Sequence, residues 1–158
     1  MSAVTAPIGA VLLDSGPLSL ATQRPGQSAE GDSVQGWIRD LLRSGIPVYV
    51  PEIADYELRR KLLHLGHAAS VARLDRFNAA WPARYVPITT PIMRLAADLW
   101  AQARRTGQSM APPEALDGDV ILAAQALTLG VPGLVVATSN PGHLSRFVTA
   151  EEWRNILP

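Results

Sequence analysis

Four short apolar runs recur along the chain and constrain its fold more than any other feature. They are AVLL at 10–13, PVYV at 47–50, YVPI at 85–88 and LVVA at 134–137. Each has the length and composition of a short strand, and the proline within YVPI favours a place near a sheet edge. Because helix-length stretches separate the runs, the sequence predicts an α/β fold with a mostly parallel central sheet of four to five strands flanked by helices.

The stretches between these runs carry the periodicity of amphipathic helices. One helix is expected from a cap at Asp32 or Ser33 to Gly45, after a polar loop at 22–33. A second helix is expected to start near Pro17. A third begins after Pro51, breaks at Gly66 and continues as a helical stretch to near Ala80. The last two are expected from Ile92 to near Gly107 and over 114–130, with a loop at 108–115 between them.

Composition narrows the class of protein. With 158 residues, 47% of them hydrophobic and 18% charged, residues 1–158 are expected to form a single globular domain. No uncharged apolar run reaches the length of a membrane span, and the N-terminus lacks the basic leader of a signal peptide. The absence of cysteine excludes disulfides and agrees with a reducing compartment, so we expect a cytoplasmic protein.

The overall charge is balanced, with 14 basic and 14 acidic residues, which does not indicate a strongly basic nucleic-acid-binding domain. Six basic residues nevertheless lie between positions 59 and 84, where Asp75 is the one acid: Arg59, Arg60, Lys61, Arg73, Arg76 and Arg84. This region is either a solvated helix face or a surface that binds phosphates.

Carboxylates lie where a parallel sheet would bring them together. Asp14 ends the first apolar run, Glu57 follows the second, and Asp117 and Asp119 lie near the start of the apolar stretch 114–130. Such acids would repel one another at the carboxyl ends of the strands unless a divalent cation neutralised them, and oxygen ligands favour Mg²⁺ or Mn²⁺.

Structural roles compete with metal binding at each of these positions. Asp14 and Asp117 could cap helices, and Asp119 could interact with a helix dipole. Glu57 could pair with Lys61 one helical turn away on a solvated face.

Four segments resemble, in order and spacing, the motifs of PIN-domain nucleases, which include the VapC-like ribonuclease toxins. They are VLLDSGPL at 11–18, PEIADYELRRKL at 51–62, DGDVILAAQAL at 117–127 and VVATSNPGHLSRF at 135–147. The resemblance implies a single three-layer PIN-like domain over residues 1–158. It also implies a metal-dependent endoribonuclease that hydrolyses phosphodiester bonds in RNA, acts as the toxin of a toxin–antitoxin pair and has an antitoxin protein as a possible partner.

The resemblance assigns roles to individual residues. Asp14, Glu57 and Asp119 match the acids that hold Mg²⁺ or Mn²⁺ for catalysis, and Thr138 and Asn140 match a T-R-N element. Arg59 and Arg60, beside Glu57, are expected to bind flanking phosphates.

The chain departs from the family at His143, where many members have a fourth aspartate. An imidazole can contact phosphate or ligate Mn²⁺ but cannot supply the missing negative charge, so Asp117 is the residue expected to share that role as a metal ligand. His143 could equally be an ordinary loop histidine. The departure also favours an alternative function, a catalytically impaired PIN domain that acts as a nucleic-acid-binding or adaptor module.

An aspartyl-phosphate hydrolase of another α/β fold is a third possibility. The sequence LLDSGPL counts against it, because such enzymes use a second acid two residues after the first, and position 16 is Gly16.

Self-association is also expected, because Trp37, Leu62 and Leu63 belong to wide apolar stripes that one sheet offers little room to cover. The protein is therefore predicted to be a homodimer that binds RNA and no membrane.

Overall fold

A five-stranded parallel sheet with the order β3-β2-β1-β4-β5 organises the computed structural model, which describes residues 7–107 and 113–158. The strands are β1 (Ala10–Leu13), β2 (Val48–Pro51), β3 (Tyr85–Val86), β4 (Leu134–Ala137) and β5 (Ala150–Glu151). The helices are α1 (Ser15–Ala21), α2 (Ala29–Arg43), α3 (Glu52–His64), α4 (Ala68–Ala79), α5 (Thr90–Arg105), α6 (Pro113–Leu129) and α7 (Pro141–Leu144), with a 3₁₀ turn, η1, at Trp153–Asn155.

The predicted α/β class and the parallel sheet are confirmed. All four apolar runs contain strands, and β3 lies at an edge of the sheet as the proline in its run predicts. The fifth strand, β5, and the short helix α7 were not predicted, because each is too short to show a period. Residues 108–112 of the predicted loop lie outside the described residues, and α6 has begun by Pro113.

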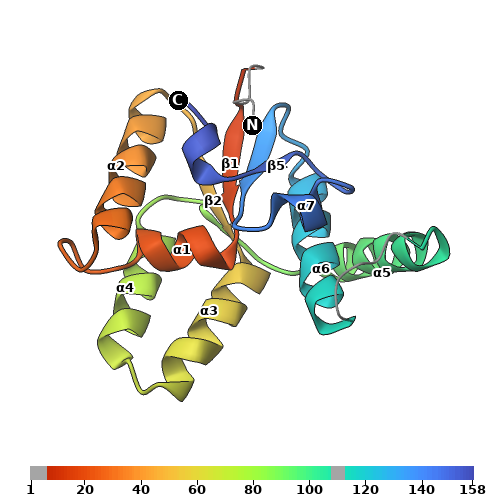
Figure 1. Cartoon of the computed structure of the whole chain (residues 1–158), viewed down its shortest axis with the longest axis horizontal. Coiled ribbons are helices and arrows are strands. Elements are labelled where there is room, and N and C mark those ends of the chain that lie inside the picture. The colour runs from red at the N-terminus through yellow and green to blue at the C-terminus, as the bar shows by residue number, and fades with distance from the viewer. Residues whose placement is uncertain (1–6, 108–112) are drawn as a thin grey trace.

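Helices cover both faces of the sheet, so the molecule has three layers (Figure 1). Side chains alternate between the two faces of a strand. Val11 and Leu13 therefore pack against α1 and α2, whereas Leu12 faces α6. Behind α6, helix α5 adds a further cluster of buried side chains. No helix in the described parts of the chain is long and apolar enough to cross a membrane.

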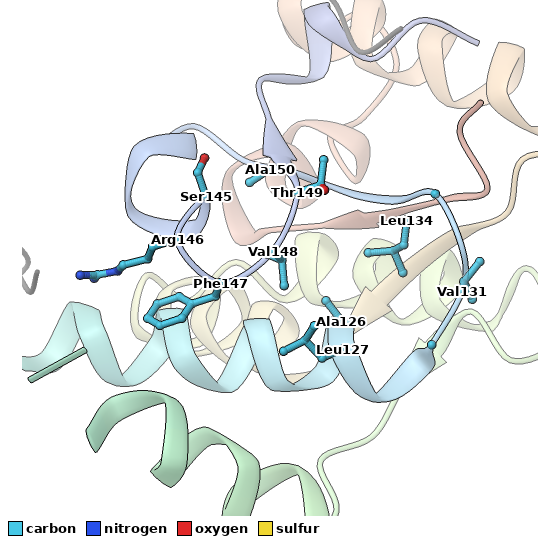
Figure 2. A pocket seen from close by; sticks show the side chains of 12 residues that line it. Ala126, Leu127, Val131, Leu134, Ser145, Arg146, Phe147, Val148, Thr149 and Ala150 are labelled. Atoms are coloured by element: carbon cyan, nitrogen blue, oxygen red, sulfur yellow. The ribbon is translucent and has the colours of Figure 1, made fainter. Parts of the chain in front are cut away.

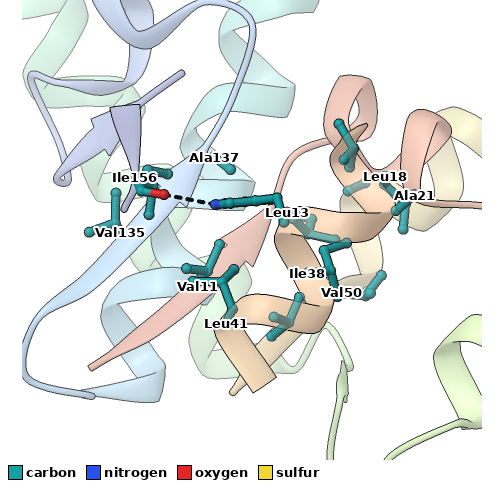
Figure 3. Close-up of a cluster of buried hydrophobic side chains, with 14 of the residues drawn as sticks. Val11, Leu13, Leu18, Ala21, Ile38, Leu41, Val50, Val135, Ala137 and Ile156 are labelled. Carbon is teal, nitrogen blue, oxygen red and sulfur yellow. Dashed lines mark hydrogen bonds between the residues drawn. The ribbon is translucent and has the colours of Figure 1, made fainter. Parts of the chain in front are cut away.

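Trp37 belongs to the core on the α2 side of the sheet, which Figure 3 shows in close-up. It is 7% exposed, and its indole Nε1 donates a hydrogen bond of 2.7 Å to the carbonyl of Ile156. Leu62 also packs against this core, whereas Leu63 is 62% exposed. The prediction that Trp37 and Leu62 form a dimer surface is therefore wrong, because the monomer already buries most of their apolar area.

A buried amide joins α6 to the sheet. Gln125 is fully buried in the all-apolar middle of this helix. Its Nε2 donates to the carbonyl of Val86 at 2.7 Å, and its Oε1 accepts from the backbone N–H of Ile53 at 3.2 Å. These bonds satisfy an amide that would otherwise be costly to bury.

Helix α2 begins earlier than the sequence predicts. Its N-cap is Ser28, whose Oγ accepts from the N–H of Gly31 at 2.9 Å, and neither Asp32 nor Ser33 is the cap. Asp32 lies in the first turn and accepts from the N–H of Gly26 at 2.8 Å. The polar first turn lies ahead of the apolar stripe, so the periodicity alone missed it. The expected end is correct, because Gly45 follows α2 with φ +77°, which favours glycine.

Replacing Ser28 with alanine is expected to lower the free energy of unfolding by about 1 kcal/mol, because the N–H of Gly31 loses its capping acceptor. Chemical denaturation measures the change. The matched control is Ser33→Ala, at the cap position that the periodicity favours, which should stay within about 0.5 kcal/mol of the wild type. An equal loss in both variants would contradict the observed start of α2.

Candidate active site

The candidate site lies at the point where the order of the strands reverses. From β1 the chain adds β2 and β3 on one side and then β4 and β5 on the other. The carboxyl ends of β1 and β4 therefore flank a crevice, which is the usual ligand position in open parallel sheets. Asp14 follows β1 and Thr138 follows β4 directly.

The Asp14 carboxylate accepts two hydrogen bonds, one at each oxygen. Its Oδ1 accepts from the N–H of Ser15 at 2.7 Å, and its Oδ2 accepts from the hydroxyl of Thr138 at 2.8 Å. The interpretation of Asp14 as a helix cap is thus correct, since Asp14 is the N-cap of α1. The same carboxylate also joins the ends of the two central strands, which a cap alone does not require.

The Thr138 hydroxyl has a second role in the turn after β4. Thr138 is 2% exposed, and its Oγ1 accepts from the backbone N–H of Asn140 at 3.1 Å. Asn140 takes part in the turn through its backbone, and its side chain is exposed. These two residues therefore order the site around Asp14.

Glu57 reaches the crevice from α3. Burial, the negative charge of Asp14 and that of Asp119 raise its pKa, while Arg60 opposes them. A Cβ atom at Gly118 of α6 would lie 3.6 Å from Glu57 Oε2, so the carboxylate lies against that helix.

Asp119 is the most perturbed acid of the three. Burial, followed by the charge of Asp14, raises its pKa from 3.8 to about 6, against the opposing effect of His143 and Arg146. Its Oδ2 is buried and accepts no hydrogen bond, and the Nδ1 atom of His143 lies 3.9 Å away. A buried carboxylate oxygen without a donor is chemically suited to a cation as its partner.

The structure therefore brings together three of the four predicted acids. Asp14, Glu57 and Asp119 are close enough for their charges to raise the pKa values of the last two. Within residues 7–107 and 113–158, however, no three His, Cys, Asp or Glu side chains are already grouped tightly enough to hold one metal ion. A bound ion would have to draw these carboxylates closer together.

Asp117 lies elsewhere. It is exposed and lines a cavity between α5 and α6 together with Trp100 and Val120. Residues two positions apart point to different faces of a helix, so Asp117 cannot join Asp119 at the crevice. Because α6 begins at Pro113, Asp117 is not an N-cap either. The N-cap interpretation required the helix to start beside Gly118, and the metal-ligand interpretation rested on His143 standing in place of a fourth acid.

The two arginines beside Glu57 have different environments. Arg59 donates to Asp55 at 2.8 Å and to Asp75 at 2.7 Å, so two carboxylates hold the side chain predicted to bind phosphate. Arg60 is exposed, lies 5.1 Å from the Tyr56 ring centroid and acts electrostatically on Glu57. Arg60 is thus the better placed of the two to meet a phosphate near the acids.

Arg146 is a site residue that the sequence reasoning missed. It acts electrostatically on Asp119, and its Nε donates to the carbonyl of His143 at 3.2 Å. The signal was present in the motif segment 135–147, which contains Arg146 three residues after His143. Arg146 supplies positive charge at the α7 side of the crevice, beside His143.

A cavity of about 670 Å³ lies on the other side of Arg146, between the end of α6 and residues 145–150 (Figure 2). Its described lining contains no carboxylate and is formed mainly by small and apolar residues such as Ala126, Val131 and Val148. This cavity therefore lacks the groups that hydrolytic chemistry requires and is separate from the acidic crevice.

Solved structures share this fold. FitAcB from Neisseria gonorrhoeae matches with a TM-score of 0.67 at 23% sequence identity, covering 91% of this chain and 98% of that chain. VapBC2 from Rickettsia felis, bound to a DNA fragment from their promoter, also gives 0.67, at 14% identity and with the same coverage. VapBC-5 from Mycobacterium tuberculosis, a member of the VapBC family of toxin-antitoxin systems, gives 0.51 at 15% identity over 95% of this chain and 99% of that chain.

Sequence comparison adds nothing further, because neither protein-family models nor curated proteins give a match. The structural likeness nevertheless covers nearly the whole chain. It confirms the three-layer, PIN-like fold that the sequence resemblance implies.

The raised pKa of Asp119 predicts how stability depends on pH. Between about pH 4 and pH 6 the folded protein keeps the proton that the unfolded chain has lost, so stability falls as the pH rises through this window. Asp119→Asn should therefore be more stable than the wild type at pH 7 by roughly 1–2 kcal/mol, since partial exposure screens the charge. Denaturant unfolding in EDTA at several pH values measures the difference.

At pH 4 the stability gain of Asp119→Asn should vanish, because Asp119 is then protonated in the folded wild type. Asp117→Asn is the control, because it removes an exposed carboxylate of the same helix outside the crevice, and it should not show the gain that Asp119→Asn shows at pH 7. A stability gain of Asp119→Asn that is the same at pH 4 and pH 7 would contradict a buried, repelled carboxylate.

Proposed function

We propose that this chain is a metal-dependent endoribonuclease and the toxin of a toxin–antitoxin pair. The observation that carries the proposal is the meeting of Asp14, Glu57 and Asp119 at the sheet crevice, with Asp119 Oδ2 buried and without a donor. Perturbed carboxylates that converge in a crevice are typical of catalytic sites. The fold is compatible with this role, and the neighbour from M. tuberculosis is described as a member of a toxin-antitoxin family.

The three acids fit Mg²⁺ or Mn²⁺. Carboxylate oxygens are the preferred ligands of both ions. Burial and then repulsion raise the pKa values of Glu57 and Asp119, and a divalent charge would offset both effects. The chemistry supplied by such an ion is a lower pKa for the attacking water and stabilisation of charge on the leaving oxygen.

The remaining side chains bind and orient the substrate. Thr138 holds the Asp14 carboxylate in place, and the backbone of Asn140 holds Thr138. Arg60 on one side of the acids and His143 with Arg146 on the other offer positive charge to the phosphates that flank the scissile bond. The acids therefore lie between basic side chains on two sides of the crevice.

Conservative variants test the metal site by two readouts. Asp14→Asn, Glu57→Gln and Asp119→Asn should each weaken Mn²⁺ binding in calorimetry and lower the rate of RNA cleavage by about a hundredfold or more. Asn retains the capping ability of Asp14, so the fold should persist. Asp117→Asn is the matched control, because it removes a carboxylate of the same helix on a different face, and it should behave as the wild type.

The alternative function, a nucleic-acid-binding or adaptor module, is favoured by His143 in place of a fourth acid. The same experiment separates the two functions. A wild-type protein that binds RNA but neither binds Mn²⁺ nor cleaves would establish the module and overturn the nuclease.

We also propose that the protein forms a homodimer in the cytoplasm and has an antitoxin protein as its partner. Exposed apolar side chains support an interface, among them Leu63 at 62%, Met93 at 45% and Trp100 at 36%. Light scattering should give the mass of two chains at micromolar concentration. A monomeric mass that stays unchanged on adding RNA or Mn²⁺ would exclude the dimer.

A further inference from the structure

Four arginines line a single groove on the side of α1 away from the acids. This groove, called here the arginine groove, has a volume of about 430 Å³ and lies between the end of α1, helix α2 and helix α4. Its arginines are Arg39, Arg73, Arg76 and Arg84, and its described lining includes no carboxylate. Four cations without an acid among them create a local positive potential that the balanced total charge conceals.

Arg84 is the most unusual of these arginines because it is 3% exposed. Its guanidinium carbon lies 4.3 Å from the centroid of the Phe77 ring, and its Nη1 donates to the carbonyl of Phe77 at 2.9 Å. Its Nε is buried and has no hydrogen-bond partner. Burial lowers the pKa of Arg84 to about 10, so the group is still a cation at neutral pH. A buried cation of this kind is stabilised by an anion beside it.

The other arginines of the groove are only partly engaged. Arg73 donates to the carbonyl of Thr22 and to Ser70 Oγ, at 3.1 and 2.9 Å. Arg39 and Arg76 are exposed and have no hydrogen bond or ion pair to another residue in the described part of the chain.

Nearby acids do not neutralise this groove. Asp75 is held by Arg59, and Asp40 lies 3.8 Å from Arg43. The guanidinium groups of Arg39 and Arg76 are therefore available to a ligand, in the bidentate geometry that suits phosphate.

The position of the groove indicates a polymer. Helix α1 carries Asp14 at its N-terminal cap and Thr22, a lining residue of the groove, at its C-terminal cap. These caps are roughly 12 Å apart along the helix at 1.5 Å per residue. Figure 1 shows α1 running from the end of β1 towards α2 and α4. One nucleic-acid strand can therefore contact the acidic crevice and the arginine groove together.

An aromatic side chain favours single-stranded RNA over an acidic peptide. Trp81 lines the groove and is 53% exposed. An exposed indole beside arginines offers a stacking surface that any base can use, whereas an acidic peptide has no need of one. Aromatic rings that interleave with cations are the usual arrangement in sequence-tolerant single-strand binding.

We propose that the arginine groove binds the phosphate backbone of the RNA substrate at nucleotides away from the cleavage site. This inference rests on the proposed function and adds a second contact region to it. Because the contacts are to phosphates, the groove contributes affinity and orientation without sequence preference.

Binding of a fluorescently labelled single-stranded RNA to the full chain tests the groove. All proteins carry Asp14→Asn, so that RNA is not consumed, and anisotropy is recorded over a range of salt concentrations. The test variant adds Arg39→Ala and Arg76→Ala. The control adds Arg94→Ala and Arg105→Ala, which remove the same charge from exposed positions on α5. Thermal unfolding of each protein verifies that it is folded.

In the test variant, the slope of log affinity against log salt should fall by about 1.4, which is 0.7 for each lost phosphate contact with a single strand. Affinity at low salt should drop about tenfold, while the control should match its Asp14→Asn parent. Equal salt slopes in the test variant and the control would overturn the proposal. Loss of binding to a polyglutamate peptide with unchanged RNA binding would assign the groove to an acidic protein segment and overturn it as well.

Two outcomes separate this proposal from the proposed function. A reduced slope in the test variant, together with a wild-type protein that fails to cleave, would support the groove and remove the nuclease. Cleavage by the wild type with an unchanged slope in the test variant would support the nuclease and remove the groove.

Discussion

The hydrogen bond from the Thr138 hydroxyl to Asp14 Oδ2 joins the ends of the two central strands. The chain must return from β3 to the other side of β1 before β4 can supply Thr138, so the bond forms only when the sheet has its full order. Glu57 and Asp119 then reach the same crevice from α3 and α6, on opposite layers. The strand order thus creates the site. The fold brings the three carboxylates together and so imposes the electrostatic repulsion between them.

The sequence predicts the strands better than the helix ends, for a physical reason. Burial on both faces leaves an unbroken apolar run, whereas the first turn of a helix can be wholly polar and capped by any small hydroxyl, as α2 is by Ser28. The start of α6 was predicted to within one residue, yet Asp117 was misplaced because it lies on the face of this helix next to α5. The period of a helix gives the angle between two of its side chains. Which of these side chains faces the crevice depends on the elements that pack against the helix.

The prediction of the site was limited because the charged partner of a side chain can come from a distant part of the sequence. Arg59 is adjacent to Arg60, yet α4 supplies Asp75 to the first and leaves the second exposed. Among the acids, Asp14 carried the clearest positional signal, since it directly follows β1 at the carboxyl end of the sheet. Positive charge carries no such positional signal, because an arginine side chain is long enough to serve either its own helix or a neighbour.

The buried amide of Gln125 has a consequence for Asp119, which lies on the same helix. By bonding the backbone of Ile53 in the first turn of α3 and that of Val86 at the end of β3, Gln125 fixes the rotation and the height of α6 against the sheet. A slip of one residue would turn the helix by about 100° and carry the carboxylate out of the crevice. The orientation of the Asp119 carboxylate thus depends on Gln125, a buried side chain on the same helix that lies outside the crevice.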